Sequence, residues 1–299
     1  MIEAQNLRRR YGDFVAVDDV SFSIAPGEVV GLLGHNGAGK TTIMKMLTGF
    51  LEPSAGQVVV DGVQLDADPL GVQARLGYLP ESLPLYPELT VTDYLVHAAR
   101  LRSLDPGACV PRAVHATQLE AKAFDRIETL SRGYKQRLGV AQAILHEPDF
   151  LILDEPSNGL DPNQIQHMRD LIKEIASHAT IILSTHIMQE VNAVCDRVMI
   201  LRNGRLVVDE QLAALRASNQ ARLVTAPDAA VSELLEAVGG VRGSRSTAPG
   251  EWVLELADDS REAVAAAARA LVEAGAPIYR LTPEARDLET VFAEVSDAA

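Results

Sequence analysis

The chain has 299 residues, of which 47% are hydrophobic and 23% charged, and its formal net charge at pH 7 is -14. This composition is typical of a globular protein and excludes a disordered chain. The negative charge argues against a broad nucleic-acid-binding surface, because phosphate backbones would be repelled over most of the protein.

Two further classes are not expected from the sequence. No apolar stretch reaches the roughly 20 residues that span a bilayer, and the N-terminus lacks the pattern of a signal peptide. We therefore expect a cytosolic location. Cys109 and Cys195 have no metal-ligand spacing, so we interpret both as ordinary thiols.

The N-terminal part is predicted to be rich in β-strands. Strand-forming residues occupy 3–7 and 15–24, and the turn Pro26-Gly27 precedes an apolar strand over 29–33. Residues 56–62 predict a further strand.

A phosphate-binding loop follows the apolar strand directly. Glycines let successive backbone N–H groups approach phosphate oxygens, and a helix that begins near Lys40 directs the positive end of its dipole at them. In this motif the lysine reaches the β and γ phosphates and the next hydroxyl contacts magnesium. A simple glycine turn between strand and helix is the alternative. The predicted nucleotide-binding residues are Gly34, His35, Asn36, Gly37, Ala38, Gly39, Lys40, Thr41 and Thr42.

A helical region is predicted from about 81 to 145. Thr90 and Asp93 resemble a capping box at the start of one helix. The apolar residues of this helix are predicted to lie on one of its faces; they are Val91, Tyr94, Leu95, Ala98 and Leu101.

The same region contains Leu130-Ser131-Arg132-Gly133, which opens a helix that ends before Pro148. A serine hydroxyl, a glycine N–H and a helix dipole together form an anion site. On these residues alone, an ordinary helix cap is the commoner explanation.

A second apolar strand, 150–154, ends in the carboxylates Asp154 and Glu155. An unbroken apolar run suits a strand buried in a parallel sheet, and open α/β sheets bind ligands at the carboxyl ends of their strands. Asp154 is placed to hold magnesium, and Glu155 to orient or deprotonate the water that attacks the γ phosphate. Capping of the next helix is the alternative.

The order of these elements resembles the nucleotide-binding subunit of ATP-binding cassette (ABC) transporters, over roughly residues 1–215. The resemblance implies a P-loop NTPase cassette of the α/β class, with a β-rich N-terminal part and a helical signature subdomain. It implies that Tyr11 lies against adenine and that His186, after strand 180–185, contacts the γ phosphate and acts with Glu155 in catalysis. It also implies that Ser131, Gly133 and Asp161 reach the nucleotide of an opposite subunit.

The chain departs from the family pattern at two places. Glu81 stands where most members have a glutamine that contacts magnesium and the attacking water, so the metal ligands expected here are Thr41, Glu81 and Asp154. A carboxylate keeps the ligating oxygen but loses the amide donor and adds negative charge. Arg132 and Tyr134 replace a glycine and a glutamine. Both features resemble a bacterial exporter branch that includes gliding-motility and drug-export ATPases.

The region after the cassette has a different pattern. Asn203-Gly204 predicts a hairpin between strands near 198–201 and 206–208. We place the cassette at 1–217 and a small α+β domain at 218–299, with strands near 252–256 and 278–281, a helix over 261–274 and a last helix that holds Leu288, Val291 and Phe292.

The expected function is that of an ATP-hydrolysing subunit, with ATP and Mg²⁺ as cofactors, at the cytoplasmic face of the inner membrane. The expected partners are integral membrane permease subunits and a second copy of the chain or a homologous ATPase. A docking surface for the permease is predicted near Leu83, Leu85 and Tyr86, although packing of these residues within the chain is an equal alternative. A soluble relative acting on ribosomes or nucleic acid is the second hypothesis.

Overall fold

The computed structural model divides the chain into two compact units, Met1–Leu212 and Ala213–Ala299. It describes residues 1–216, 218–227, 231–236, 238–257, 261–284 and 288–297. The boundary predicted from the sequence falls at residue 217, which lies outside the described residues.

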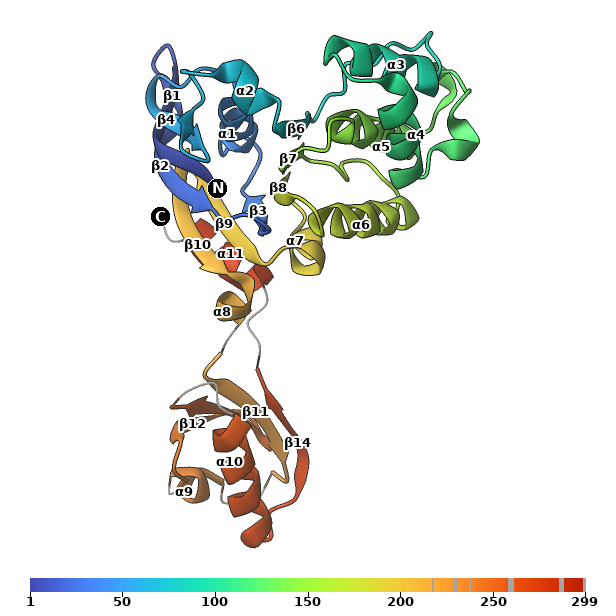
Figure 1. The fold of residues 1–299 in the computed structure, drawn as a ribbon. Helices are drawn as coiled ribbons and strands as arrows, with labels where there is room; N and C mark the ends of the chain where they lie inside the picture. Colours follow the sequence, from blue (N-terminus) through green and yellow to red (C-terminus); the bar gives the residue numbers. More distant parts are fainter. Residues whose placement is uncertain (217, 228–230, 237, 258–260, 285–287, 298–299) are drawn as a thin grey trace. The chain divides into compact units, whose positions relative to one another are not determined.

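Figure 1 shows the elements of the first unit in chain order. Its strands are β1 (Ile2–Tyr11), β2 (Phe14–Ile24), β3 (Val29–Leu33), β4 (Ala55–Val60), β5 (Val63–Gln64), β6 (Leu76–Leu79), β7 (Phe150–Asp154), β8 (Thr180–Thr185), β9 (Arg197–Arg202) and β10 (Arg205–Gln211). Its helices are α1 (Lys40–Leu47), α2 (Pro69–Gln73), α3 (Val91–Leu101), α4 (Pro106–Ala116), α5 (Arg132–Ile144), α6 (Pro162–Ala176) and α7 (Met188–Val194), with short 3₁₀ turns at Glu120–Lys122 and Ile127–Thr129; α8 (Leu212–Arg216) begins at the end of the unit.

The strands of the first unit form two sheets. One is antiparallel, in the order β2-β1-β4-β5, and the other has the order β10-β9-β3-β8-β7-β6. In the second sheet all neighbouring strands are parallel except β10, which pairs antiparallel with β9. This mixed α/β architecture confirms the fold class predicted from the sequence.

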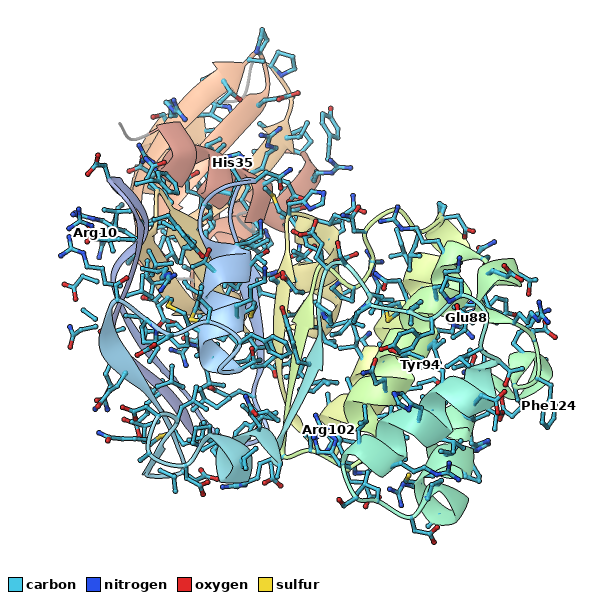
Figure 2. The ribbon with its side chains drawn as sticks, turned by 90° about the horizontal axis from the view of Figure 1, so that it is seen from above. Arg10, His35, Glu88, Tyr94, Arg102 and Phe124 are labelled. Carbon is cyan, nitrogen blue, oxygen red and sulfur yellow. The ribbon has the colours of Figure 1, made fainter. Side chains whose placement is uncertain are left out.

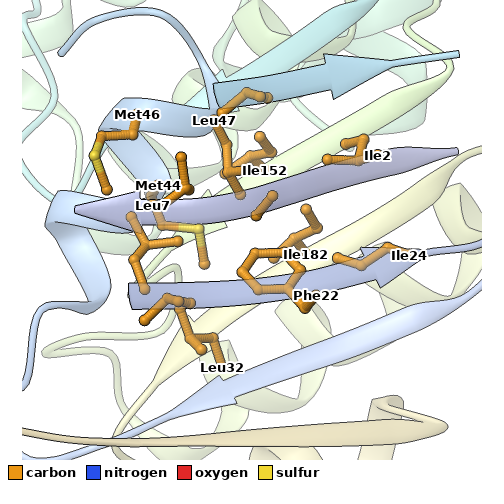
Figure 3. Packing of buried hydrophobic residues seen from close by; sticks show 14 of the residues in the cluster. Ile2, Leu7, Phe22, Ile24, Leu32, Met44, Met46, Leu47, Ile152 and Ile182 are labelled. Carbon is orange, nitrogen blue, oxygen red and sulfur yellow. The ribbon is translucent and has the colours of Figure 1, made fainter. Parts of the chain in front are cut away.

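The main hydrophobic core lies between these sheets. Helix α1 contributes Ile43, Met44, Met46 and Leu47, all 0% exposed, and strands of both sheets surround it. Figure 3 shows Met44, Met46 and Leu47 gathered with Ile2 and Phe22 of the antiparallel sheet. Because α1 is wedged between two sheets, its first residue and the loop before it are held in place.

The helical region has a core of its own. Thr90 caps α3 by accepting a hydrogen bond from the Asp93 N–H at 3.1 Å, as the sequence predicted. Tyr94 lies inside this region and donates to Gln142 at 2.6 Å, whereas Figure 2 shows Phe124 at its outer rim. Of the apolar positions predicted to share one face of α3, Val91, Tyr94, Leu95 and Ala98 are buried, whereas Leu101, the last residue of the helix, is 74% exposed.

The second unit is a small α+β domain. Its strands β11 (Gln220–Thr225), β12 (Val241–Ala248), β13 (Glu251–Leu256) and β14 (Ile278–Pro283) form an antiparallel sheet in the order β12-β13-β11-β14. Its helices are α9 (Val231–Glu236), α10 (Arg261–Glu273) and α11 (Leu288–Asp297). Its core joins one face of the sheet to α9 and α10 through apolar residues such as Leu223, Leu254 and Leu271.

Candidate functional site

The parallel sheet brings the predicted polar residues to one edge. The register pairs Leu33 of β3 with Thr185 of β8, and Asp154 of β7 with Ser184 of β8. The phosphate loop, the carboxylate pair and His186 therefore follow strands that end side by side, although about 150 residues separate the first from the last.

Glycine is required in the phosphate loop at two points. Gly37 and Gly39 have φ values of 83° and 107°, in the left-handed region that favours glycine. A Cβ at Gly39 would also come within 2.5 Å of the Ala16 carbonyl oxygen. The loop is therefore folded tightly against β2, and Gly39 leads directly into α1.

Lys40 is the buried cation of the site. It is 6% exposed, and its Nζ donates to the Gly34 carbonyl at 2.7 Å. The same Nζ lies 3.5 Å from Oε1 of Glu155. The other carboxylate oxygen of Glu155, Oε2, lies 2.8 Å from Nδ1 of His186. Glu155 is thus held between the lysine of the phosphate loop and the histidine after β8.

The backbone at Glu155 is unusual. Its φ is 50°, a left-handed value that is rare for a residue with a side chain. Its N–H donates to the Ser184 carbonyl at 3.0 Å, and Ser184 Oγ lies within 3.2 Å of the same nitrogen. These bonds to β8 hold the chain in a conformation that directs the carboxylate toward Lys40 and His186.

Asp154 is fully buried beside them. Ser184 Oγ donates to Asp154 Oδ1, and Thr41 Oγ1 lies 3.4 Å from the same oxygen. Oδ2 is buried without a hydrogen-bond partner. Burial raises the pKa of Asp154; the hydroxyl donors oppose this, and the charges of Glu81 and Glu155 add to it. A cation that binds Oδ2 would remove this unfavourable balance.

A hollow of about 520 Å³ opens over these groups. The predicted residues that line it are Tyr11, His35, Asn36, Gly37, Gly39, Lys40, Thr41, Thr42, Glu81, Glu155 and His186. Gly34 and Ala38 lie behind this surface: the Gly34 carbonyl accepts from Lys40, and the Ala38 carbonyl accepts from the Gly204 N–H at 3.0 Å. Asp154 lines a neighbouring hollow together with Thr41, Glu81 and Tyr78.

Three predicted residues lie elsewhere. Ser131, Gly133 and Asp161 are not among the described residues that line either hollow. Ser131 caps α5, and Asp161 caps α6 by accepting from the Gln164 N–H at 2.9 Å. Gly133 faces the Gln164 side chain, which a Cβ would meet at 2.7 Å. In a single chain, this group is therefore separate from the Lys40 site.

Comparisons with known proteins identify the family of this chain. The family model described as "ABC transporter" matches residues 17–158. An uncharacterised ABC transporter ATP-binding protein, YdbJ of Bacillus subtilis (strain 168), is 31% identical over 300 residues, which cover 100% of this chain and 96% of the relative. The chain belongs to the family of ABC transporter ATP-binding proteins.

Other relatives of this ABC protein carry more specific names. Nod factor export ATP-binding protein I of Paraburkholderia xenovorans (strain LB400) is 39% identical, and the match covers 73% of each chain. A solved structure titled as the ATP binding subunit of an ABC transporter is 34% identical, with a TM-score of 0.65, and the match covers 72% of this chain and 92% of the other. A cassette at 23% identity, MJ0796, has the same TM-score and supports the fold alone.

Sequence reasoning missed three residues that line the hollow, which are Phe14, Ala16 and Asn158. Phe14 is 63% exposed and pairs with Tyr11 across the turn between β1 and β2. The two-residue turn Gly12-Asp13 was the available signal, because such a turn places its flanking residues opposite each other. Arg9 lies over the Tyr11 ring at 4.8 Å, so two aromatic rings and a guanidinium gather at this end of the hollow.

Proposed function

We propose that this ABC transporter ATP-binding subunit hydrolyses ATP to ADP and phosphate and so powers an exporter whose membrane-spanning subunits are separate chains. The observation that carries the proposal is the arrangement of Lys40, Glu155 and His186 around one hollow, with Asp154 in the neighbouring hollow and with Lys40 and both carboxylates buried. Buried charges are costly to stability, and at a concave site they indicate function.

The phosphate loop provides the nucleotide contacts. Backbone N–H groups of residues 34–39 and the N-terminus of α1 would bind the phosphate oxygens, and Lys40 would neutralise the β and γ phosphates. Lys40 now donates to Gly34 and lies beside Glu155, so binding requires its ammonium to turn from these partners to the phosphates. Tyr11 and Phe14 offer ring faces to the adenine.

The residues present fit a magnesium ion. Asp154 has a buried oxygen without a partner, and Thr41 and Glu81 offer oxygens beside it, which are the ligands that Mg²⁺ prefers. No group of three or more His, Cys, Asp or Glu side chains in the described part of the chain is arranged to hold a metal. Phosphate oxygens and water would thus complete the coordination, and the ion would arrive with the nucleotide. Bound magnesium would offset the repulsion between three carboxylates and the triphosphate.

Glu155 and His186 would act on the attacking water. Glu155 Oε1 is an acceptor that could orient or deprotonate a water molecule once Lys40 has moved to the phosphates. His186 is 47% exposed, so its ring can reach a γ phosphate while Nδ1 stays close to Glu155. We assign Glu155 as the general base and His186 as the residue that contacts the γ phosphate.

A second copy of the chain, or a homologous ATPase, would complete the site. Charge develops around the three equatorial oxygens of the γ phosphoryl group, and Lys40 covers one side of the hollow. Ser131, Gly133 and Asp161 lie outside the hollow of their own chain, so in our proposal they contact the nucleotide of the partner subunit. Two nucleotides would then be enclosed between two chains.

The transport role is supported by the names of relatives. One relative is named for Nod factor export and another, in Bacillus subtilis, for linearmycin resistance. No helix among the described residues has the length and apolar character needed to cross a bilayer. We propose that permease subunits bind this chain at the cytoplasmic face of the inner membrane. Tyr86, 49% exposed, remains the candidate contact, because Leu85 packs into the helical core.

A steady-state ATPase assay tests the proposed hydrolysis. We expect the Glu155→Gln variant to lose at least about 100-fold in kcat, because the amide cannot accept the water proton, and to retain binding of Mg-ATP. Glu147→Gln is a matched control, since Glu147 is an exposed carboxylate in an ion pair with Arg112. Equal rates in Glu155→Gln and the natural chain would refute the assigned role.

Capture of partners from membranes tests the transport role. Detergent-solubilised membranes should yield a multi-span permease bound to the natural chain, and Tyr86→Asp should weaken that capture without changing ATP binding. Reproducible capture of ribosomes in place of a permease would favour the soluble alternative.

A further inference from the structure

A buried carboxylate lies behind the site and has no role in the function proposed above. Glu190 belongs to α7, which begins two residues after His186, and it is 2% exposed. The Thr185 hydroxyl donates to Glu190 Oε2 at 2.8 Å. Burial of a carboxylate destabilises the folded state, so packing alone does not explain why Glu190 is buried here.

The bonds around Glu190 enclose His186 on both sides. The Ile187 N–H donates to Thr185 Oγ1 at 3.0 Å, and that hydroxyl in turn donates to Glu190. Thr185 precedes His186 and Ile187 follows it, so this chain of bonds fixes the backbone turn that carries the histidine. Glu190 is the terminal acceptor, and without it the Thr185 hydroxyl loses its direction.

The same carboxylate lies close to the segment after Glu155. Burial raises the pKa of Glu190, whereas the hydroxyls of Thr185 and Ser157 and the charge of Arg169 lower it. Ser157 is 3% exposed and lies two residues beyond Glu155, and Arg169 belongs to α6. Glu190 therefore lies where the histidine turn, the Glu155 segment and α6 meet.

Glu190 and Arg169 each keep a polar atom without a hydrogen-bond partner. Oε1 of Glu190 and Nε of Arg169 are both buried without a hydrogen-bond partner. Opposite charges in this condition attract each other strongly, because the surroundings screen them poorly. A small movement of α6 or of the segment after Glu155 could thus change the contacts of Glu190.

We propose that Glu190 is a positioning residue for ATP hydrolysis: through Thr185 it holds His186 at Glu155 and couples this histidine to the segment that leads to α6. The inference rests on the proposed function, because hydrolysis is the step that Glu190 assists. Glu190 does not contact the nucleotide. Its effect is therefore expected on kcat, with little effect on binding.

The test compares four variants of the full chain. Glu190→Ala and Thr185→Val each break the bond between the two side chains, and each should lower kcat about tenfold or more, because small displacements of catalytic groups are costly. KM and the Kd for an uncleavable ATP analogue should stay within about twofold. Glu190→Gln keeps an acceptor oxygen for Thr185 and should restore most of kcat. The double variant, which combines Glu190→Ala with Thr185→Val, should be no slower than the slower of the two single variants, because each single variant already removes the hydrogen bond between Thr185 and Glu190.

Thr180→Val provides the matched control. Thr180 is a buried threonine at the other end of β8, and its hydroxyl accepts from the Gly27 N–H. This variant should lower thermal stability and leave kcat unchanged. A loss of kcat in Glu190→Ala no greater than in Thr180→Val, or multiplying losses in the double variant, would overturn the inference.

NMR of the histidine side chains separates this inference from the proposed function. The His186 imidazole signal, assigned with His186→Gln, should shift in Glu190→Ala and Thr185→Val and stay in place in Thr180→Val. An unmoved signal in all three variants would overturn the positioning role. If the natural chain shows no hydrolysis that depends on Glu155, the proposed function fails, while the histidine signal still decides whether Glu190 positions His186.

Discussion

The carboxyl edge of the parallel sheet and the core of the second unit differ in the kind of side chain that they bury. At the sheet edge four charged side chains are buried, which are Lys40, Asp154, Glu155 and Glu190. Among the described residues of the second unit, the buried side chains are apolar except Thr225, whose hydroxyl donates to the Pro277 carbonyl. The first region carries a cost in stability that the second avoids.

This difference indicates where selection for function acts. A buried charge persists only when its partners are placed for it, and at the sheet edge the partners are residues that the proposed chemistry uses. The second unit instead follows the rule for a packing domain, in which apolar side chains of a sheet and two helices cover each other. Substitutions at the edge should thus change nucleotide chemistry, and substitutions in the second core should change stability.

The largest expected effect on nucleotide binding is at Lys40. Lys40→Ala removes the buried ammonium that would neutralise the phosphates, so affinity for an uncleavable ATP analogue should fall about 100-fold or more, or about 2.7 kcal/mol. Titration calorimetry with Mg²⁺ present measures it. Lys45→Ala is the control, because Lys45 is an exposed lysine of the same helix. Similar affinities in the two variants would place the nucleotide elsewhere.

A core substitution in the second unit tests the other side of the comparison. Leu254 is 0% exposed, and Leu254→Ala should destabilise the second unit by about 2–5 kcal/mol through lost burial and a cavity. Hydrogen exchange resolved by peptide should show faster exchange in β11 and β13, with nucleotide affinity within about twofold of the natural chain. Tyr279→Ala, at a 68% exposed position, should change little. A joint loss of nucleotide binding would show that the two units are energetically coupled.

The charge of Asp154 predicts a pH-dependent stability. Its pKa is raised above the ordinary value of 3.8, chiefly by burial, so the folded state holds the proton more tightly than the unfolded state. The resulting penalty appears as pH rises above 3.8 and is complete above the raised pKa. Asp154→Asn should therefore be more stable than the natural chain by about 1–2 kcal/mol at pH 7, with an advantage that shrinks toward pH 4. Urea unfolding across this range measures it. If the stability difference between Asp154→Asn and the natural chain does not vary with pH, the difference arises from hydrogen bonding and not from the charge of Asp154.

Local patterns predicted much of the fold, because they depend on neighbours in sequence. The strand over 29–33, the helix from Lys40 and the cap at Thr90 agree with the structure. The roles of individual site residues stay predictions. The bonds of Glu155 to both Lys40 and His186, and the burial of Glu190, had no sequence signal, because they join segments that meet only when the sheet forms.

The smallest expected effect concerns the turn between β9 and β10, which supports the phosphate loop. Asn203 and Gly204 have φ values of 49° and 78°, as the hairpin prediction requires, and the Gly204 N–H donates to the Ala38 carbonyl at 3.0 Å. Asn203→Ala should cost about 1 kcal/mol, because alanine tolerates a left-handed φ less well, and Asn203→Gly should cost less. Thermal unfolding measures both. If Asn203→Ala weakens nucleotide binding by as much as it lowers stability, the turn contributes to the phosphate site through Gly204, and the residues that matter for function extend to β10. If the affinity is unchanged, these residues are confined to the phosphate loop and to the strands that precede it.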